Sequence, residues 1–269
     1  MRPRSPGPAL RVHRRFVSRT LRNRRDLWVW LPPGYLDARG AGRPRHPVVY
    51  FQDGQNIFDP ATAFLGRPWH AGERAAELVR DGSIAAPILV GVGHAGEERI
   101  DEFTPTPGDY HDLGGQLRRS PGGARRYLRF LVREVKPFID ARYRTLAGAR
   151  STSIVGSSMG GLVALYAVLW HSRVFGRAAA LSPSVWWDGR RVLRDFAALT
   201  RKRAVRLWLD TGTAEPGWEV VQRLRDLAVA RGWTQDADLH YEAVPGAEHS
   251  EEAWAARIGR VLQFLVGRD

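Results

Sequence analysis

The 269-residue sequence contains no cysteine, only two methionines and only two lysines. The lack of cysteine excludes disulfide bonds, thiolate metal ligands and a cysteine nucleophile. No apolar run approaches the roughly 18 residues that a membrane-spanning helix requires. The N-terminal segment also lacks the apolar stretch of about 7–15 residues found in a secretory signal peptide, which favours a cytoplasmic protein.

What the sequence does contain is typical of a globular chain. Hydrophobic residues make up 43% and aromatic residues 10% of the sequence, enough for one domain with a substantial core. We divide the chain into a basic N-terminal flank with the first strand, residues 1–25, and a single α/β domain over residues 26–269.

Positive charge is concentrated in the first 25 residues. The formal net charge is +13, and nine arginines with no acidic residue lie within residues 1–25. Such an excess can indicate binding to nucleic acid or to an anionic surface. The sequence shows no nucleic-acid fold signature, and its aromatic residues do not alternate with the basic runs. We therefore expect a solvated basic flank, and neither nucleic acid nor a membrane as partner.

Candidate strands and helices alternate along the chain. This order predicts a mostly parallel sheet covered by helices on both faces, with its ligand site at the carboxyl ends of the strands. Residues 104–121, rich in proline and glycine, are expected to form a surface loop. The expected strands are Leu10–Phe16, Asp26–Leu31, Pro47–Phe51, Ala86–Val92, Ser151–Val155, Ala178–Leu181, Ala204–Leu209 and Asp238–Val244. The expected helices are His70–Arg80, Arg125–Ile139, Leu162–Trp170, 218–231 and 251–266.

The segment Gly156-Ser157-Ser158-Met159-Gly160 matches the pattern G-x-S-x-G. In this pattern the serine occupies a strained turn between strand and helix, and flanking glycines avoid collisions there. The bare pattern also fits a tight Gly-Ser turn without catalytic role, but here it joins a β-rich stretch to an apolar helical one. This context predicts Ser158 as a nucleophile and the N–H of Met159 as an oxyanion donor. Ser157 lacks the flanking glycines.

A serine nucleophile needs a base, and in this arrangement an acid and then a histidine follow the serine along the chain. Only three histidines follow Ser158. His171 lies on the helix that leads away from the nucleophile, and His240 lies inside an expected strand. His249 follows the last strand in a loop, where the fold delivers its base, so we assign it that role.

Two residues are candidates for the acid. It should follow the strand that ends in RLWLD, where Asp210 closes the strand and Glu215 lies just beyond the turn. Asp210 could instead cap the turn at Thr211 and Gly212. Spacing alone leaves the choice between the two acids open.

At these residues the chain resembles the putative-esterase family of α/β-hydrolases. This family includes esterase D (S-formylglutathione hydrolase), enterochelin and related siderophore esterases, feruloyl esterases and mycolyltransferases. The resemblance extends from about Asp26 to Leu265, and its specificity lies in the order of several segments rather than in any one of them. The segments are LWVWLPPGY, VVYFQDGQNIFD, ERIDEFTPTP, SIVGSSMGGLVALY, LSPSVWW, LDTGTAEP and VPGAEHSEEAW.

The resemblance implies an α/β-hydrolase fold and two further site residues. It implies that Glu215 is the acid, with Asp210 in reserve, and that the N–H of Gln55 is the second oxyanion donor. The cysteine-containing motif region expected of S-formylglutathione hydrolases is missing, which disfavours glutathione thioesters. The missing signal peptide disfavours an extracellular feruloyl or mycolyl enzyme.

Aromatic residues in loops after the strands are candidates for the substrate pocket. Trp186 and Trp187 follow the strand after the nucleophile helix, although core packing is equally plausible for one of them. Phe103 is a further candidate, and Tyr110, Trp69 and His94 are weaker ones. Arg99 and Asp101 either brace their loop as an ion pair or touch the substrate, and the sequence leaves these two roles open.

The leading hypothesis is therefore a carboxylic-ester hydrolase acting on small or aromatic esters through Ser158, His249 and Glu215. It needs no cofactor and no metal, and its partner is a small-molecule ester. The alternatives are a siderophore esterase of the enterochelin type, an acyltransferase with the same triad, and an idle hydrolase fold that serves as a binding module. The oligomeric state is not predicted.

Overall fold

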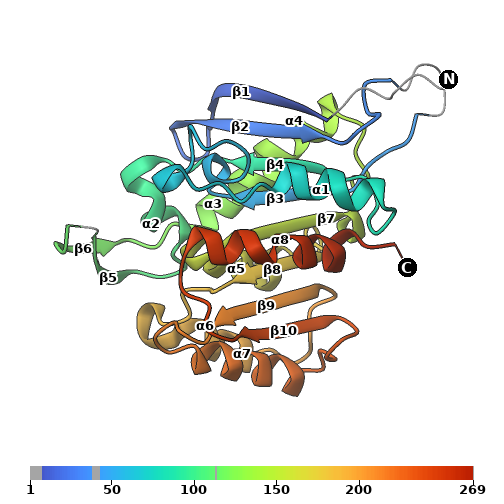
Figure 1. The fold of residues 1–269 in the computed structure, drawn as a ribbon. Helices are drawn as coiled ribbons and strands as arrows, with labels where there is room; N and C mark the ends of the chain where they lie inside the picture. Colours follow the sequence, from blue (N-terminus) through green and yellow to red (C-terminus); the bar gives the residue numbers. More distant parts are fainter. Residues whose placement is uncertain (1–7, 38–42, 113, 269) are drawn as a thin grey trace.

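A computed structural model describes residues 8–37, 43–112 and 114–268. Its centre is an eight-stranded sheet in the order β1-β2-β4-β3-β7-β8-β9-β10, which runs from top to bottom in Figure 1. β1 pairs antiparallel with β2 and β2 antiparallel with β4, whereas the remaining neighbours are parallel. The strands are β1 (Ala9–Val17), β2 (Arg24–Leu31), β3 (Val48–Gln52), β4 (Ile88–Val92), β7 (Thr152–Ser157), β8 (Arg177–Leu181), β9 (Arg206–Gly212) and β10 (Leu239–Val244).

Helices cover both faces of the sheet, as the alternating order predicts. One face packs against α1 and α8, and the other against α3, α4, α5, α6 and α7. Successive side chains of a strand point to opposite faces, so Val48 and Tyr50 enter one core cluster and Val49 and Phe51 enter the other. The helices are α1 (Ala71–Arg80), α2 (Arg99–Phe103), α3 (Ala124–Phe130), α4 (Lys136–Arg142), α5 (Ser158–His171), α6 (Trp187–Ala197), α7 (Glu219–Ala230) and α8 (Glu251–Val266).

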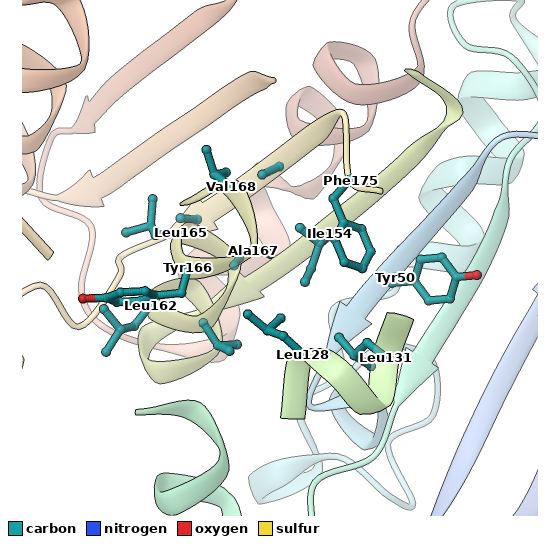
Figure 2. Close-up of a cluster of buried hydrophobic side chains, with 14 of the residues drawn as sticks. Tyr50, Leu128, Leu131, Ile154, Leu162, Leu165, Tyr166, Ala167, Val168 and Phe175 are labelled. Carbon is teal, nitrogen blue, oxygen red and sulfur yellow. The ribbon is translucent and has the colours of Figure 1, made fainter. Parts of the chain in front are cut away.

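Helix α5, which begins at Ser158, lies inside the core. Eleven of its 14 residues are buried, and apolar side chains surround it on nearly every side. Figure 2 shows Leu162, Leu165 and Val168 of α5 within the same cluster as Leu128 of α3 and Ile154 of β7. A helix that is apolar all round is held by packing on several sides, so the start of α5 has a fixed position relative to β7.

Two segments differ from the sequence-based expectation. Residues 104–121 do not form a featureless loop, because β5 (Gly108–His111) pairs with β6 (Leu117–Ser120) in an antiparallel hairpin that projects from the body in Figure 1. The expected helix over residues 125–139 is α3 and α4 joined by a π-helical turn, Leu131–Val135. The sequence-based expectation did not include α2 and α6. The five residues of α2 are too few for a periodic pattern, whereas α6 is amphipathic but its first turn contains three residues in the left-handed conformation, Asp188, Gly189 and Arg190.

The N-terminal flank contributes to the sheet. Residues 1–7 lie outside the described residues, and the remainder of the flank forms β1 and the start of β2. Arg11 and Arg14 are exposed on β1, with Arg14 paired to Asp26 at 2.7 Å. Arg25 in β2 is instead buried and bonded to Glu102, so the expectation of a solvated basic flank holds only in part. In the part of the chain that the structure describes, no helix is long and apolar enough to cross a membrane.

Candidate active site

Ser158 occupies a sharp turn at the junction of β7 and α5. Its φ is +53°, in the left-handed region that residues other than glycine rarely adopt, and it remains partly exposed. The flanking glycines are required by contact: a Cβ on Gly156 would lie 2.4 Å from the carbonyl of Gly160, and one on Gly160 would lie 3.1 Å from Cβ of Gln52. The strand, the turn and the helix therefore present the Ser158 hydroxyl above the sheet.

His249 and Glu215 meet at the same end of the sheet. His249 lies in the loop between β10 and α8, and Glu215 lies in the turn after β9. The His249 Nδ1 atom is 2.7 Å from Oε2 of Glu215. The edge of the Trp254 ring packs on the imidazole, with the ring centroids 4.9 Å apart. This leaves the opposite ring nitrogen, Nε2, available for a proton from another group.

The second carboxylate oxygen of Glu215 accepts two further hydrogen bonds. Ser182 Oγ donates to Oε1 at 2.5 Å, and the N–H of Gly212 donates to the same atom at 2.6 Å. Burial alone would raise the pKa of Glu215, but the hydrogen bonds from His249, Ser182 and Gly212 together hold that pKa below its ordinary value. Glu215 is therefore an oriented, ionised acceptor for the imidazole.

Asp210, the other candidate acid, makes its hydrogen bonds in the protein interior and not with His249. It is fully buried at the end of β9, where its carboxylate accepts from Trp208 Nε1 at 2.7 Å and from the Ser182 N–H at 3.1 Å. Arg257 Nη1 lies 3.3 Å from its Oδ1. Burial raises the pKa of Asp210 to about 6. The carboxylate that reaches His249 is that of Glu215.

Ser158, Met159 and His249 line one cavity of about 440 Å³. Two walls of this cavity are aromatic: Trp187 is almost fully buried, whereas Trp186 is 55% exposed. The hairpin contributes Tyr110 from β5. The lining also includes Arg99, Ile100, Asp109, His111 and Ser184. Of the two adjacent tryptophans, one thus belongs to the core and one to the surface, and both face the cavity.

Three of the aromatic candidates are not part of this lining. Phe103 is fully buried and packs on the Tyr127 ring at a centroid distance of 5.0 Å, so its expected place in the pocket is wrong. Trp69 is buried and donates through Nε1 to Glu251 at 2.5 Å. His94 also lies outside the cavity. Helix α2 turns Phe103 inward and the segment after β3 turns Trp69 inward, whereas His94, which follows β4, is partly buried.

Two of the remaining histidines have structural surroundings. The His240 ring stacks on Trp208 with centroids 4.0 Å apart, and burial is the main cause that lowers its pKa. His171 ends α5, far along the helix from Ser158. These positions agree with the assignment of the base to His249 alone.

Gln55 lies in the short 3-10 helix Gly54–Asn56, close behind the end of β3. The turn is held from both sides. A Cβ on Gly54 would lie 2.3 Å from the carbonyl carbon of Gly91, and the preceding Asp53 accepts from Arg99 Nε at 2.7 Å and Nη2 at 2.8 Å. Arg99 therefore pairs with Asp53. The partner considered from the sequence was Asp101. No sequence signal joins Arg99 to Asp53, because they lie 46 positions apart.

Ser182 and Ser184 were not predicted from the sequence. Ser182 contacts Glu215, and Ser184 Oγ lies 3.3 Å from Ser158 Oγ. They belong to the segment LSPSVWW, which is one of the segments that carry the family resemblance but from which only the tryptophans were taken as site candidates. Among the described residues, no group of three or more histidines, aspartates or glutamates is placed to hold a metal ion.

Known proteins resemble this chain in sequence and in fold. It is 25% identical to the protein YbbA of Bacillus subtilis over 91% of this chain and 94% of that one. It is 30% identical to the siderophore triacetylfusarinine C esterase of Aspergillus fumigatus over 64% of this chain, but it spans only 56% of that enzyme. The BES protein from Bacillus cereus superposes with a TM-score of 0.73 at 20% identity, covering 96% of this chain and 95% of that one.

The superposition and the sheet order show an α/β-hydrolase fold of the esterase type. Residues 18–265 match the family described as "Putative esterase". The chain therefore belongs to this esterase family.

Proposed function

We propose that the protein is a carboxylic-ester hydrolase that acts through a Ser158–His249–Glu215 triad. One observation carries this proposal: a partly exposed serine on a glycine-flanked turn shares a cavity with a histidine whose Nδ1 is 2.7 Å from a buried carboxylate. Family membership supports ester hydrolysis as the reaction class. The geometry supports the serine mechanism within that class.

The reaction proceeds in two steps. Ser158 Oγ attacks the carbonyl carbon while His249 Nε2 takes its proton, and the tetrahedral intermediate then expels the alcohol, which receives that proton. Water next attacks the acyl-enzyme, gives a proton to His249, and releases the acid while Ser158 recovers its hydrogen. Glu215 holds the imidazole in the tautomer with hydrogen on Nδ1 and stabilises its charged form.

Two backbone amides are proposed to hold the oxyanion. The N–H of Met159 lies at the start of α5, where the positive end of the helix dipole also favours negative charge. The N–H of Gln55 belongs to the turn after β3, which Gly91 and Arg99 fix in place. Rigid donors of this kind cost no reorganisation when charge develops on the substrate.

The cavity supports small or aromatic esters as substrates. Trp186, Trp187 and Tyr110 offer flat apolar surface beside Ser158, and the volume accommodates one aromatic ring with its ester. A siderophore esterase is the second candidate, favoured by the aromatic wall together with the Arg99 guanidinium in the lining. A relative from Aspergillus fumigatus is a siderophore esterase.

The test uses p-nitrophenyl acetate and p-nitrophenyl benzoate with the wild type and Ser158→Ala. We expect Ser158→Ala to lose about four or more orders of magnitude in kcat/KM and to lose labelling by a fluorophosphonate. Ser153→Ala is the matched control, because Ser153 is a buried serine of β7 whose Oγ has no hydrogen-bond partner among the described residues. Activity that survives unchanged in Ser158→Ala would overturn the proposal.

A further inference from the structure

The segment Ser182-Pro183-Ser184, here called the SPS segment, contacts both ends of the proposed triad. It follows β8 directly and is nearly fully buried, with Ser182 2% and Ser184 3% exposed. It packs on the first turn of α5, where a Cβ on Gly161 would lie 3.1 Å from Cα of Pro183. One short segment thus lies between the nucleophile and the acid.

Backbone hydrogen bonds fix the position of the SPS segment. The Ser182 N–H donates to the carbonyl of Asp210 at 2.9 Å and to its Oδ1 at 3.1 Å, and the Ser184 N–H donates to the carbonyl of Ser158 at 3.0 Å. Ser182 adopts φ +42°, a left-handed conformation that costs a serine free energy. Such a conformation persists only where the surrounding contacts determine it, and here β9 and the nucleophile turn both do so.

The hydroxyl of Ser182 has a defined direction. A hydroxyl has one hydrogen to donate and two lone pairs to accept with. Trp254 Nε1 donates to Ser182 Oγ at 3.0 Å, and Arg257 Nη2 donates to it at 3.2 Å. Because these donors occupy both lone pairs, the single hydrogen is directed to Oε1 of Glu215, 2.5 Å away. Oε2 is thereby turned toward His249.

Asp210 and Arg257 stabilise this arrangement through their contacts with Ser182 and with each other. Arg257 is 1% exposed, so its charge is placed in the interior beside Asp210 and Ser182. A buried guanidinium requires partners. Arg257 Nη2 donates to the Ser182 hydroxyl and Nη1 is ion-paired with Asp210 at 3.3 Å, while Nε and Nη1 have no hydrogen-bond partner among the described residues. Asp210, which does not reach His249, thus holds Ser182 in place. Ser182 in turn orients Glu215, the acid that does reach His249.

We propose that Ser182 and Ser184 are positioning residues of the triad, with Ser182 orienting the Glu215 carboxylate and Ser184 orienting the Ser158 hydroxyl. This inference rests on the proposed function. Ser182 acts on the acid–base pair because it bonds the carboxylate that faces His249. Ser184 acts on the nucleophile alone because its Oγ is 3.3 Å from Ser158 Oγ and its N–H holds the Ser158 carbonyl.

Replacement of Ser182 and replacement of Ser184 should therefore change the kinetics in different ways. Without the Ser182 hydroxyl, the Glu215 carboxylate loses one of two donors on Oε1, so it is less well oriented and more basic toward the imidazolium of His249. The acidic limb of the kcat/KM profile then moves to higher pH. The other charged or titratable groups that share the cavity with His249 are Arg99, Asp109, Tyr110 and His111, and they are unchanged in this variant. Loss of the Ser184 hydroxyl leaves the acid–base pair intact.

The experiment measures kcat, KM and the rate of fluorophosphonate labelling from pH 5 to pH 9 for the full chain. We expect Ser182→Ala to lower kcat about 10-fold with KM within twofold, and to raise the midpoint of the acidic limb. We expect Ser184→Ala to lower kcat and the labelling rate about fivefold with the midpoint unchanged. Ser153→Ala should behave as the wild type.

Ser182→Gly is the second variant, because glycine adopts φ +42° without strain and so keeps the fold if Ser182→Ala loses it. It should show the same shift of the acidic limb. A Ser182 variant whose pH profile overlays that of the wild type overturns the positioning role, whether its rate is normal or uniformly reduced. Ser158→Ala in the same series separates the two proposals: if it is inactive while the Ser182 and Ser184 variants are normal, only the present inference fails.

Discussion

The floor and the mouth of the candidate site differ in solvent exposure and in hydrogen bonding. On the floor, Glu215, Ser182 and Asp210 are each under 9% exposed and joined by short hydrogen bonds. At the mouth, Trp186 is 55% exposed, and the hairpin residues Asp109 and His111 are exposed as well. A floor of this kind fixes reacting groups in one geometry, whereas the mouth can vary without disturbing them. We therefore expect chemistry and substrate preference to separate between the two regions.

The contrast is sharpest between two acids of the floor. Asp210 and Glu215 leave the same strand end five residues apart, yet one is fully buried beside Arg257 and the other meets His249. The turn at Gly212 separates them. A Cβ on Gly212 would lie 2.0 Å from the carbonyl of Ala247, so the β9 turn and the loop that carries His249 touch there. Close contact between these loops brings Glu215 under the imidazole.

Within this comparison of floor and mouth, the largest effect should come from Glu215→Gln. Ser182 Oγ and the Gly212 N–H both donate to Oε1, so the amide oxygen of glutamine must take that place. Its NH₂ group then faces His249 Nδ1 and forces the hydrogen onto Nε2, where no proton can be accepted from Ser158. We expect kcat to fall about 10²- to 10⁴-fold. The measurement is steady-state hydrolysis of p-nitrophenyl acetate at pH 8.

Asp210→Asn is the matched control for this variant, because it also replaces a carboxylate by an amide on the floor. It should keep kcat within about threefold, since Asp210 reaches the triad only through Ser182. If Asp210→Asn lost as much turnover as Glu215→Gln, the division between the two acids would be wrong.

The next effect concerns stability and pH. Burial raises the pKa of Asp210 to about 6, above the value of about 3.9 for an unfolded aspartate. The folded state therefore binds the proton more tightly, so the stabilisation is complete below about pH 4 and is lost as the pH rises through 6. Relative to Asp210→Asn, the free energy of unfolding of the wild type should fall by about 2–3 kcal/mol from pH 4 to pH 7.

Urea unfolding of both proteins at several pH values in this window measures the difference. A difference that stays constant, or that grows with pH, would show that the ion pair with Arg257 outweighs the burial of Asp210. The neighbouring charge would then be a net source of stability.

The sequence predicted the layered sheet and the parts of the site that depend on local pattern. The motif around Ser158 lies at a strand–helix junction, and a local run of residues is enough to show this. His249 was found because only one of three histidines follows the last strand. The positions of these residues could be predicted because each depends on the order of elements, and the chain order of an α/β sheet fixes which loops share an edge, whereas their catalytic roles stay predictions.

The remaining features depend on contacts that the order of elements does not determine. The pairing of Arg99 with Asp53 and the burial of Phe103 both follow from how α2 packs, and its five residues carry no periodic signal. Ser182 has no motif of its own, and its role appears only when α8 brings Trp254 and Arg257 to it. The hairpin β5–β6 was missed because its strands have four residues each.

The smallest effect should come from the mouth, where Trp186→Ala tests whether preference and chemistry are separate. Removing an exposed aromatic wall takes contact area from an aromatic acyl group and none from acetate, so KM for p-nitrophenyl benzoate should rise about 10-fold while kcat stays within twofold. KM for the acetate should not change. Trp187→Ala is the contrast, because that side chain is 1% exposed and its loss should destabilise the fold by about 3–5 kcal/mol. A fall in kcat for both esters in Trp186→Ala, without loss of stability, would mean that the mouth also positions the scissile bond, and the two regions would then act as one.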